Sequence, residues 1–89
     1  MKVLSLMVGP IMTNCYILCD EEAKVCAVID PGDEPERIAA MIASSGCAPT
    51  MLLLTHGHFD HYTGVAGLLE KWPELPVYIH RADAVDGAG

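Results

Sequence analysis

The chain has 89 residues, of which 52% are hydrophobic, and a mean hydropathy of +0.33. This length and composition indicate one small domain with a hydrophobic core and exclude a disordered segment. Twelve acidic residues against five basic ones give a formal net charge of −7, which repels both phosphate backbones and anionic lipid surfaces. We therefore expect neither a nucleic-acid partner nor a membrane partner.

The sequence also carries signals of cellular location. No apolar run approaches the ~20 residues of a membrane span, and the N-terminus lacks the pattern of a cleaved signal peptide. The four cysteines form no Cys-x-x-Cys pair and fall within apolar runs, where free cysteine behaves as a small buried hydrophobe. We expect a soluble protein of the reducing cytoplasm. The alternative is the disulfide framework of a secreted domain, which is less favoured because the apolar content suffices without cross-links.

The first part of the chain predicts three strands and a helix. Residues 2–8, 14–19 and 25–29 are apolar or alternating runs, and the charged turn between the last two indicates a hairpin. A helix follows, in which Asp33 and Glu36 form a capping-box pattern. Pro35 lies in the first turn and Gly46 is the expected left-handed stop, and one apolar stripe faces the sheet. That stripe comprises Ile38, Met41, Ile42 and, at its end, Ser45.

The second part predicts a strand, a helix and a strand. Residues 50–54 are apolar without alternation, which is typical of a central strand buried on both faces. A second amphipathic helix ends before Pro73, and residues 76–80 form a short strand, after which residues 81–84 could open another helix. Four apolar residues at the i, i+3, i+4, i+7 spacing mark the second helix: Val65, Leu68, Leu69 and Trp72.

A cluster of metal-ligand residues separates the predicted central strand from the second helix. His56, His58, Asp60 and His61 form a His-x-His-x-Asp-His pattern, and zinc, iron and manganese all accept imidazole and carboxylate ligands. Alternating positions on an extended backbone point to one side, so His56 and His58 can bind one ion while Asp60 and His61 reach a second. Catalytic groups collect at the carboxyl ends of strands in layered α/β folds. The cluster therefore suggests a metal-dependent hydrolase.

Four stretches, spread over essentially the whole chain, form a recognisable combination: Asn14–Tyr16, Val28–Gly32, Leu54–His61 with Gly64, and Val77–His80. With these stretches the chain resembles the N-terminal part of a metallo-β-lactamase superfamily hydrolase, of the glyoxalase II-like branch that includes the hydroxyacylglutathione hydrolases. The resemblance implies an α/β fold, the N-terminal half of a four-layer αβ/βα sandwich, mostly β-strands with two helices on one face. Residues 1–89 would then be a partial domain whose C-terminal half is absent.

The resemblance also assigns roles to individual residues. It implies that His56 and His58 bind the first metal and that Asp60 and His61 bind the second, with two Zn²⁺ per intact site and Fe or Mn as alternatives. Asp60 would have the one catalytic role, which is to orient the attacking hydroxide. Asp30 would support the metal loop by hydrogen bonding. The remaining ligands belong to the C-terminal half.

Three other polar residues are expected to have no functional role. His80 is more consistent with a residue at the end of a strand than with a metal ligand. Asn14 and Tyr16 are expected to be structural, with an amide and a hydroxyl that find backbone partners near the start of a strand.

The function implied by the resemblance is thioester hydrolysis of the hydroxyacylglutathione type, in which a metal-bound hydroxide attacks a small-molecule acyl thioester or related ester. The alternative is a truncated, non-catalytic metal-binding half-module, or a fragment that self-associates through an exposed apolar sheet face. Two protein ligands per ion instead of three predict weak metal binding and little turnover by these 89 residues alone.

Overall fold

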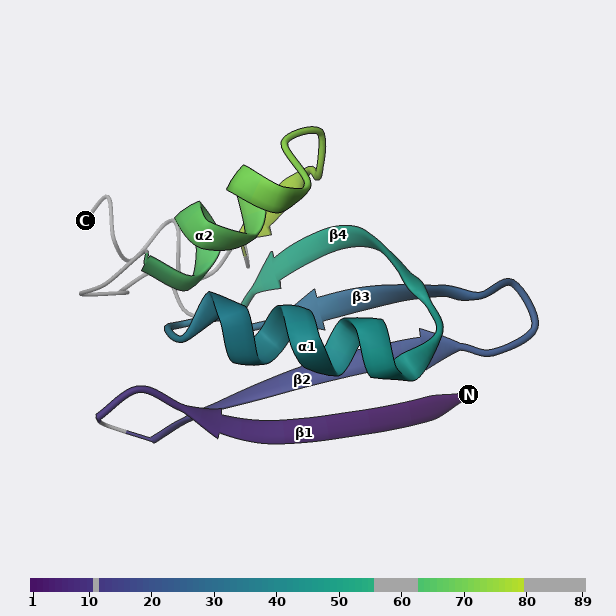
Figure 1. The fold of residues 1–89 in the computed structure, drawn as a ribbon, viewed down its shortest axis with the longest axis horizontal. Coiled ribbons are helices and arrows are strands. Elements are labelled where there is room, and N and C mark those ends of the chain that lie inside the picture. The colour runs from purple at the N-terminus through teal and green to yellow at the C-terminus, as the bar shows by residue number, and fades with distance from the viewer. Residues whose placement is uncertain (11, 56–62, 80–89) are drawn as a thin grey trace.

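The computed structural model describes residues 1–10, 12–55 and 63–79, and its order of elements is the predicted one. The predicted α/β class with two helices is confirmed (Figure 1). The strands are β1 (Lys2–Val8), β2 (Thr13–Asp20), β3 (Val25–Ile29), β4 (Ala48–Leu54) and β5 (Val77–Ile79). The helices are α1 (Pro35–Ser45) and α2 (Thr63–Lys71).

The five strands form one mixed sheet in the order β1-β2-β3-β4-β5. The pairs β1–β2 and β2–β3 are antiparallel, which confirms the predicted hairpin, whereas β3–β4 and β4–β5 are parallel. Parallel neighbours need a crossover connection, and α1 and α2 provide the two crossovers. The ends of β1, β3, β4 and β5 and the start of β2 therefore lie along one edge, which we call the carboxyl end of the sheet.

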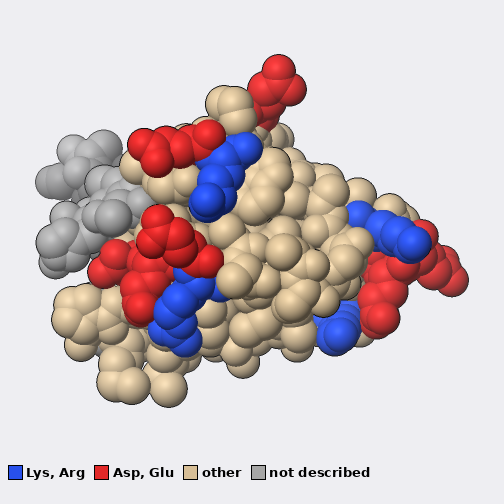
Figure 2. Space-filling model, viewed as in Figure 1, with Lys and Arg blue, Asp and Glu red and all other residues tan. Residues whose placement is uncertain are grey.

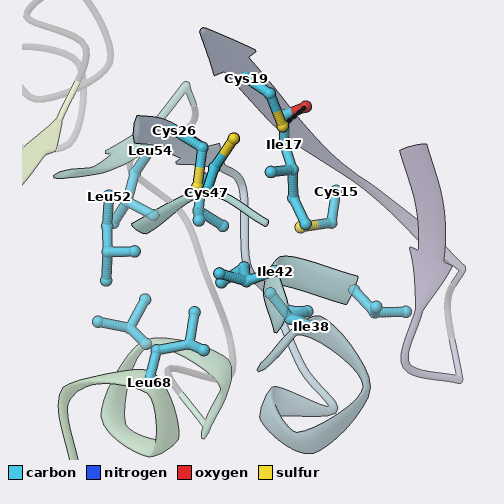
Figure 3. Packing of buried hydrophobic residues seen from close by; sticks show 13 residues of the cluster. Cys15, Ile17, Cys19, Cys26, Ile38, Ile42, Cys47, Leu52, Leu54 and Leu68 are labelled. Atoms are coloured by element: carbon cyan, nitrogen blue, oxygen red, sulfur yellow. Dashed lines mark hydrogen bonds between the residues drawn. The ribbon is translucent and has the colours of Figure 1, made fainter. Parts of the chain in front are cut away.

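Both helices cover the same face of the sheet, which we call the inner face, and the hydrophobic core lies between them and this face (Figure 3). Full burial of an Ile or Leu side chain contributes roughly 1.5–3 kcal/mol. The fully buried large side chains of this core include Ile17, Val28 and Leu52 from the sheet and Ile38, Ile42 and Leu68 from the helices. The four cysteines are free and buried, and they join the same core as predicted.

The opposite, outer face of the sheet has no described helix or strand packed on it. Leu52 and Leu54 are buried on the inner face, while Met51 and Leu53 between them stay partly exposed. The prediction that residues 50–54 are buried on both faces is therefore wrong for the described chain, because the helices cover only one face. The position of β4 as a central strand, between β3 and β5, is confirmed.

The start of α1 differs from the predicted capping box. The N-cap residue is Glu34, which has φ 53° and makes no side-chain cap hydrogen bond. The Asp33 carboxylate accepts a hydrogen bond from the adjacent Glu34 N at 2.8 Å instead of reaching into the helix. The Glu34 carboxylate accepts hydrogen bonds from Gly9 N at 2.7 Å and from Arg37 at 3.1 Å. Instead of capping the helix, the Glu34 side chain links the start of α1 to the β1–β2 turn. The predicted end of the helix at Gly46, with φ 76°, is confirmed.

The strand β4 starts at Ala48, two residues before the predicted start, and contains Pro49. The pairing register passes from Cys26–Pro49 to Ala27–Met51, so that Thr50 is the extra residue of a bulge, and bulges accommodate proline. The predicted helix at residues 81–84 lies outside the described residues, as does His80. Within the described ranges, no helix has the length and apolar character needed to cross a bilayer.

Candidate metal centre

Asp30 joins the ends of β3 and β4 at the carboxyl end of the sheet. It is only 6% exposed, and its backbone N donates a hydrogen bond to Leu53 O at 2.8 Å. Its carboxylate accepts one hydrogen bond from Thr55 N at 2.7 Å and a second from the Thr55 hydroxyl. Thr55 directly precedes His56 in the sequence. A buried carboxylate directly after β3 therefore holds the residue that directly precedes the histidine cluster.

The backbone at Asp30 is left-handed, with φ 56°. This conformation costs a non-glycine residue roughly 1–2 kcal/mol, and aspartate tolerates it better than most residues. The Asp30 carbonyl also accepts a hydrogen bond from Gly32 N at 2.8 Å, which closes the turn after β3. The turn directs the carboxylate sideways towards β4 while the chain continues towards α1.

The four predicted metal ligands, His56, His58, Asp60 and His61, lie outside the described residues. Their roles as ligands, and the catalytic role of Asp60, stay predictions. Over residues 1–10, 12–55 and 63–79, no group of three or more His, Cys, Asp or Glu side chains could hold a metal ion. What the structure shows is how the two segments that flank the cluster are held.

Gly64 lies shortly after the cluster, in the first turn of α2, where the helix packs closely against the turn after β3. A Cβ atom at this position would lie 2.1 Å from Pro31 O and 2.8 Å from Asp33 N, so only glycine allows α2 to approach the turn after β3. Gly67 makes a similar approach, with its hypothetical Cβ 2.3 Å from Pro35 Cγ at the start of α1. The segment 30–35 thus contacts the chain on both sides of the cluster, through Thr55 before it and Gly64 after it. The apolar periodicity of α2 did not predict these close contacts with segment 30–35. The one feature of the sequence that pointed to them is the glycine in the first turn of α2.

A pocket of about 480 Å³ opens beside these residues, lined by Thr13, Asn14, Tyr16, Ile29, Asp30 and Thr55. Asn14 and Tyr16 are exposed here, and neither side chain has a hydrogen-bond partner in the part of the chain that the structure describes. The backbone partners expected for their amide and hydroxyl groups are therefore absent among these residues. The two polar side chains instead line a hollow next to the Asp30–Thr55 pair.

Three buried cysteines, Cys15, Cys19 and Cys26, are poor candidates for nucleophilic attack. Burial and, secondarily, the nearby Asp30 carboxylate raise the pKa of the Cys15 thiol to about 12. Burial, followed by Cys19 and Cys47, raises the pKa of Cys26 to about 11. Burial also raises the pKa of Cys19, together with a hydrogen bond to Cys47. Because the thiolate is the reactive and ligating form, these neutral thiols act as packing groups.

Comparisons with known proteins agree on one family. The model of the metallo-β-lactamase superfamily matches residues 8–87. The chain is 41% identical over 81 residues to the probable metallo-hydrolase YqgX of Bacillus subtilis (strain 168), and the match covers 91% of this chain and 37% of that protein. It is 38% identical over 86 residues to a hydroxyacylglutathione hydrolase of Yersinia enterocolitica, covering 96% of this chain and 34% of the relative.

A solved structure supports the same relationship. The crystal structure of TTHA1623 in a di-iron-bound form matches with a TM-score of 0.75 and 42% sequence identity, covering 91% of this chain and 39% of that one. The chain therefore spans about a third of the length of the two curated relatives, 37% and 34%.

Proposed function

Because the chain belongs to the metallo-β-lactamase superfamily, we propose that it supplies one side of the metal centre of a hydrolase that cleaves thioesters of the hydroxyacylglutathione type. The observation that carries this proposal is the Asp30–Thr55 pair, which fixes the chain directly before the His-x-His-x-Asp-His cluster. The name of the relative from Yersinia enterocolitica supports the choice of substrate class.

The donor set fits divalent metal ions. In this proposal His56 and His58 bind one ion, and Asp60 and His61 bind a second. Buried carboxylates often support such centres by hydrogen bonding. We propose this role for Asp30, which is buried and accepts a hydrogen bond from Thr55 N, directly before His56. We propose Zn²⁺, with Fe or Mn as alternatives, and the related TTHA1623 structure is named for its di-iron form. When bound, the ions would supply Lewis-acid polarisation of a carbonyl and a water of lowered pKa.

The residues of the chain itself position the reactants. Asp30 holds Thr55, directly before the cluster, and Gly64 allows the chain after the cluster to pack closely against the turn after β3. We propose that a carboxylate oxygen of Asp60 accepts a hydrogen bond from the attacking water and orients it towards the substrate carbonyl. A thioester suits such a site because its carbonyl is electrophilic and a thiolate is a good leaving group.

The test is metal content and thioesterase activity of the 89-residue chain. We expect weak but measurable zinc binding by isothermal titration calorimetry, and slow, zinc-dependent cleavage of S-lactoylglutathione followed by the loss of its ultraviolet thioester absorbance. His58→Ala removes a proposed ligand and should weaken zinc binding by at least about 100-fold, a loss above the 10–100-fold typical of supporting residues. His80→Ala is the matched control and should leave zinc affinity unchanged. Zinc binding that survives His58→Ala would contradict the ligand assignment.

A second candidate function is a non-catalytic metal-binding half-module. The observation that favours it is the ligand count, because four side chains shared between two ions give each ion two protein ligands, whereas catalytic zinc sites usually have three. Specific zinc binding without cleavage of any thioester would support this candidate over the hydrolase. Thioester cleavage that requires both zinc and His58 would exclude it.

We also propose that the protein acts in the cytoplasm, on a small molecule, without nucleic-acid or membrane partners. The four free buried thiols fit a reducing compartment. On the face that carries α1, basic side chains lie beside acidic ones and form no continuous basic surface (Figure 2). Retention of the chain by anionic vesicles or by duplex DNA at physiological salt would contradict this part of the proposal.

A further inference from the structure

Three of the four cysteine thiols lie together at the end of the sheet opposite the candidate metal centre. Cys19 is near the end of β2, Cys26 near the start of β3, and Cys47 directly before β4. The antiparallel register places Cys19 opposite Cys26, and both thiols lie within interaction range of Cys47. Figure 3 shows these three side chains close to one another, with Cys15 apart from them. The mechanism proposed above uses none of these thiols.

The Cys47 thiol contacts the end of β2 directly. Its Sγ atom lies 4.0 Å from the Asp20 carbonyl oxygen, and its thiol forms a hydrogen bond with the thiol of Cys19. The backbone of Cys47 is held in place, because Cys47 N donates a hydrogen bond to Ser45 Oγ at 3.1 Å. Two sulfur atoms in hydrogen-bond contact are already neighbours, so a covalent bond between them requires only a small movement of the side chains.

Cys47 is the thiol of this group that solvent can reach. It is 8% exposed, whereas Cys26 is 2% and Cys19 is 0% exposed. Its neighbours Gly46 and Ala48 are exposed, and a hypothetical Cβ at Gly46 has open space around it among the described residues. A small molecule that arrives from solvent therefore meets Cys47 before it meets Cys19.

We propose that Cys47 and Cys19 are a peroxide-sensitive thiol pair, which a hydroperoxide converts into a disulfide. In the first step the sulfur of Cys47 attacks the O–O bond. An S–O bond forms, the O–O bond breaks, and an alcohol, or water where the oxidant is hydrogen peroxide, leaves with the thiol proton. In the second step the sulfur of Cys19 attacks the sulfenic acid of Cys47. An S–S bond forms, the S–O bond breaks, and water leaves with the Cys19 proton. Two thiols are thereby oxidised and one hydroperoxide is reduced.

Proximity compensates for the low reactivity of Cys19. Burial raises the pKa of its thiol, so Cys19 is a poor nucleophile towards a molecule from solvent. The sulfenic acid of Cys47, however, forms in contact with Cys19. A reaction between two groups that are held in contact has a high effective concentration, which allows the neutral thiol to complete the second step.

Cys26 fits a disulfide with Cys19 less well than Cys47 does. Residues directly opposite each other on antiparallel strands have Cβ atoms about 4.5–5.5 Å apart, whereas a disulfide needs about 3.8 Å. A bond between Cys19 and Cys26 would therefore distort the pairing of β2 with β3. Cys47 lies outside the strands, in the connection between α1 and β4, and can adjust to the bond.

The disulfide joins β2 to the start of β4 across β3, at the far end of the sheet from the metal-ligand cluster. Closing a loop of about 30 residues restricts the unfolded chain, so the melting temperature should rise by about 5–15 °C. Zinc affinity should stay unchanged, because Thr55 and the cluster follow the other end of β4. Disulfides that form in reducing compartments are usually transient and redox-sensing. This inference does not depend on the proposed thioesterase activity.

The first test maps the bond in the wild-type chain after treatment with hydrogen peroxide in the presence of a chelator. We expect the loss of two of the four thiols and a reducible link between the tryptic peptides 3–24 and 38–71. The first of these peptides contains Cys19 and the second contains Cys47, while Cys26 falls in the peptide 25–37 between them. Trypsin gives these peptides because it cleaves after Lys2, Lys24, Arg37 and Lys71.

Variants identify the role of each thiol. Cys47→Ser should slow the loss of thiols at least about 10-fold, because the remaining thiols are more deeply buried. Cys19→Ala should abolish the link and leave a sulfenic acid on Cys47 that dimedone labels. Cys15→Ala is the matched control on the same strand and should change neither the rate nor the link. Because Cys15 shares its tryptic peptide with Cys19, a link that persists in this control also assigns the bond to Cys19.

Several results would overturn the proposal. Equal rates of thiol loss in the wild type and Cys47→Ser would do so, as would a link between peptides 3–24 and 25–37. A link that forms only in urea, or only between two chains on a non-reducing gel, would do the same. If Cys19→Ala loses its circular dichroism spectrum, the wild-type peptide map and the melting temperature decide. A melting temperature that falls on oxidation would mean that the bond does not fit the native fold.

Discussion

The Asp30 carboxylate accepts hydrogen bonds from both the backbone N and the hydroxyl of Thr55, and so joins the ends of two neighbouring parallel strands. The backbone of Asp30 adopts a left-handed conformation, φ 56°, to present this carboxylate. A strained residue that is held by the surrounding structure is typical of functional sites. The pair is therefore the first target for mutation.

Thr55→Val keeps the shape of the side chain and removes the hydroxyl that donates to Asp30. We expect the free energy of unfolding, measured by urea denaturation, to fall by about 1–3 kcal/mol, because a buried carboxylate loses one hydrogen bond. If the pair orients the cluster, zinc affinity measured by calorimetry should also fall about 10–100-fold.

The matched control for this prediction is Thr50→Val on the same strand. The Thr50 hydroxyl donates a hydrogen bond to Cys26 O at 2.9 Å, near the opposite end of β4 from the cluster. Its loss should reduce stability by about 1 kcal/mol and leave zinc affinity unchanged. Equal effects of both variants on zinc affinity would show that the Asp30–Thr55 pair has only a structural role.

Gly64→Ala tests the close approach of α2 to the turn after β3. On helix propensity alone the change would stabilise the protein by about 1 kcal/mol. The added Cβ, however, would lie 2.1 Å from Pro31 O, a backbone atom, so the helix or the turn must shift. We expect a net destabilisation of about 1–3 kcal/mol by urea denaturation, together with weaker zinc binding.

Gly46→Ala is the control for Gly64→Ala. Gly46 has φ 76° and open space around its hypothetical Cβ, so the cost is limited to the left-handed backbone, about 1 kcal/mol. It lies at the end of α1, and zinc affinity should not change. A Gly64→Ala variant that is more stable than the wild type would refute the close approach.

The hydrogen bond between the Glu34 carboxylate and Gly9 N in the β1–β2 turn leads to a third prediction. Glu34→Ala removes the acceptor of Gly9 N and the partner of Arg37, and should lower the unfolding free energy by about 1–2 kcal/mol. Most of this loss comes from the half-buried backbone contact, because the exposed ion pair contributes little. Glu36→Ala, in the first turn of the same helix, should change stability by less than about 0.5 kcal/mol. The predicted capping box would instead require Glu36 to be the more important residue.

The elements of this fold could be predicted because their signals are local. The alternating and apolar runs, the turn residues and the glycine at the end of α1 predicted the strands and helices that the structure describes to within about two residues, as expected where pattern and turn chemistry agree. The contact of Glu34 with the β1–β2 turn could not be predicted from such local patterns. Its carboxylate bonds Gly9, which is 25 residues away in the sequence, and no local pattern encodes that contact.

In the candidate site, too, the local features could be predicted from the sequence and the non-local contacts could not. The residue types of the cluster and its place after β4 are local features, and they suffice to predict a metal site. The double hydrogen bond from Thr55 to Asp30 depends on the parallel register of β3 and β4, in which Ile29 lies opposite Leu53. Local patterns do not specify this register, and only the family resemblance pointed to Asp30. The close approach at Gly64 likewise needs the path of the turn after β3.

The buried thiol of Cys15 predicts a loss of stability at alkaline pH. The pKa of this thiol rises from 9.0 to about 12 through burial and the nearby Asp30 carboxylate. The unfolded chain therefore loses this proton from about pH 9 upwards, whereas the folded chain keeps it until about pH 12. Between these values the folded state binds more protons, so the unfolding free energy falls as the pH rises, by at most about 1.4 kcal/mol per pH unit.

Cys15→Ala removes this titration and leaves the other alkaline groups in place. The variant should be less stable than the wild type near pH 8, because it loses buried volume. Between pH 8 and pH 11, the free energy of unfolding of the wild type should fall by about 2–3 kcal/mol relative to that of Cys15→Ala, measured by urea denaturation at each pH. For Cys26→Ala the pH range over which the wild type loses stability relative to the variant should be narrower and end near pH 11, since the pKa of Cys26 is about 11. Parallel stability curves for the wild type and Cys15→Ala from pH 8 to 11 would mean that this thiol ionises alike in both states, and that its side of the core opens to solvent.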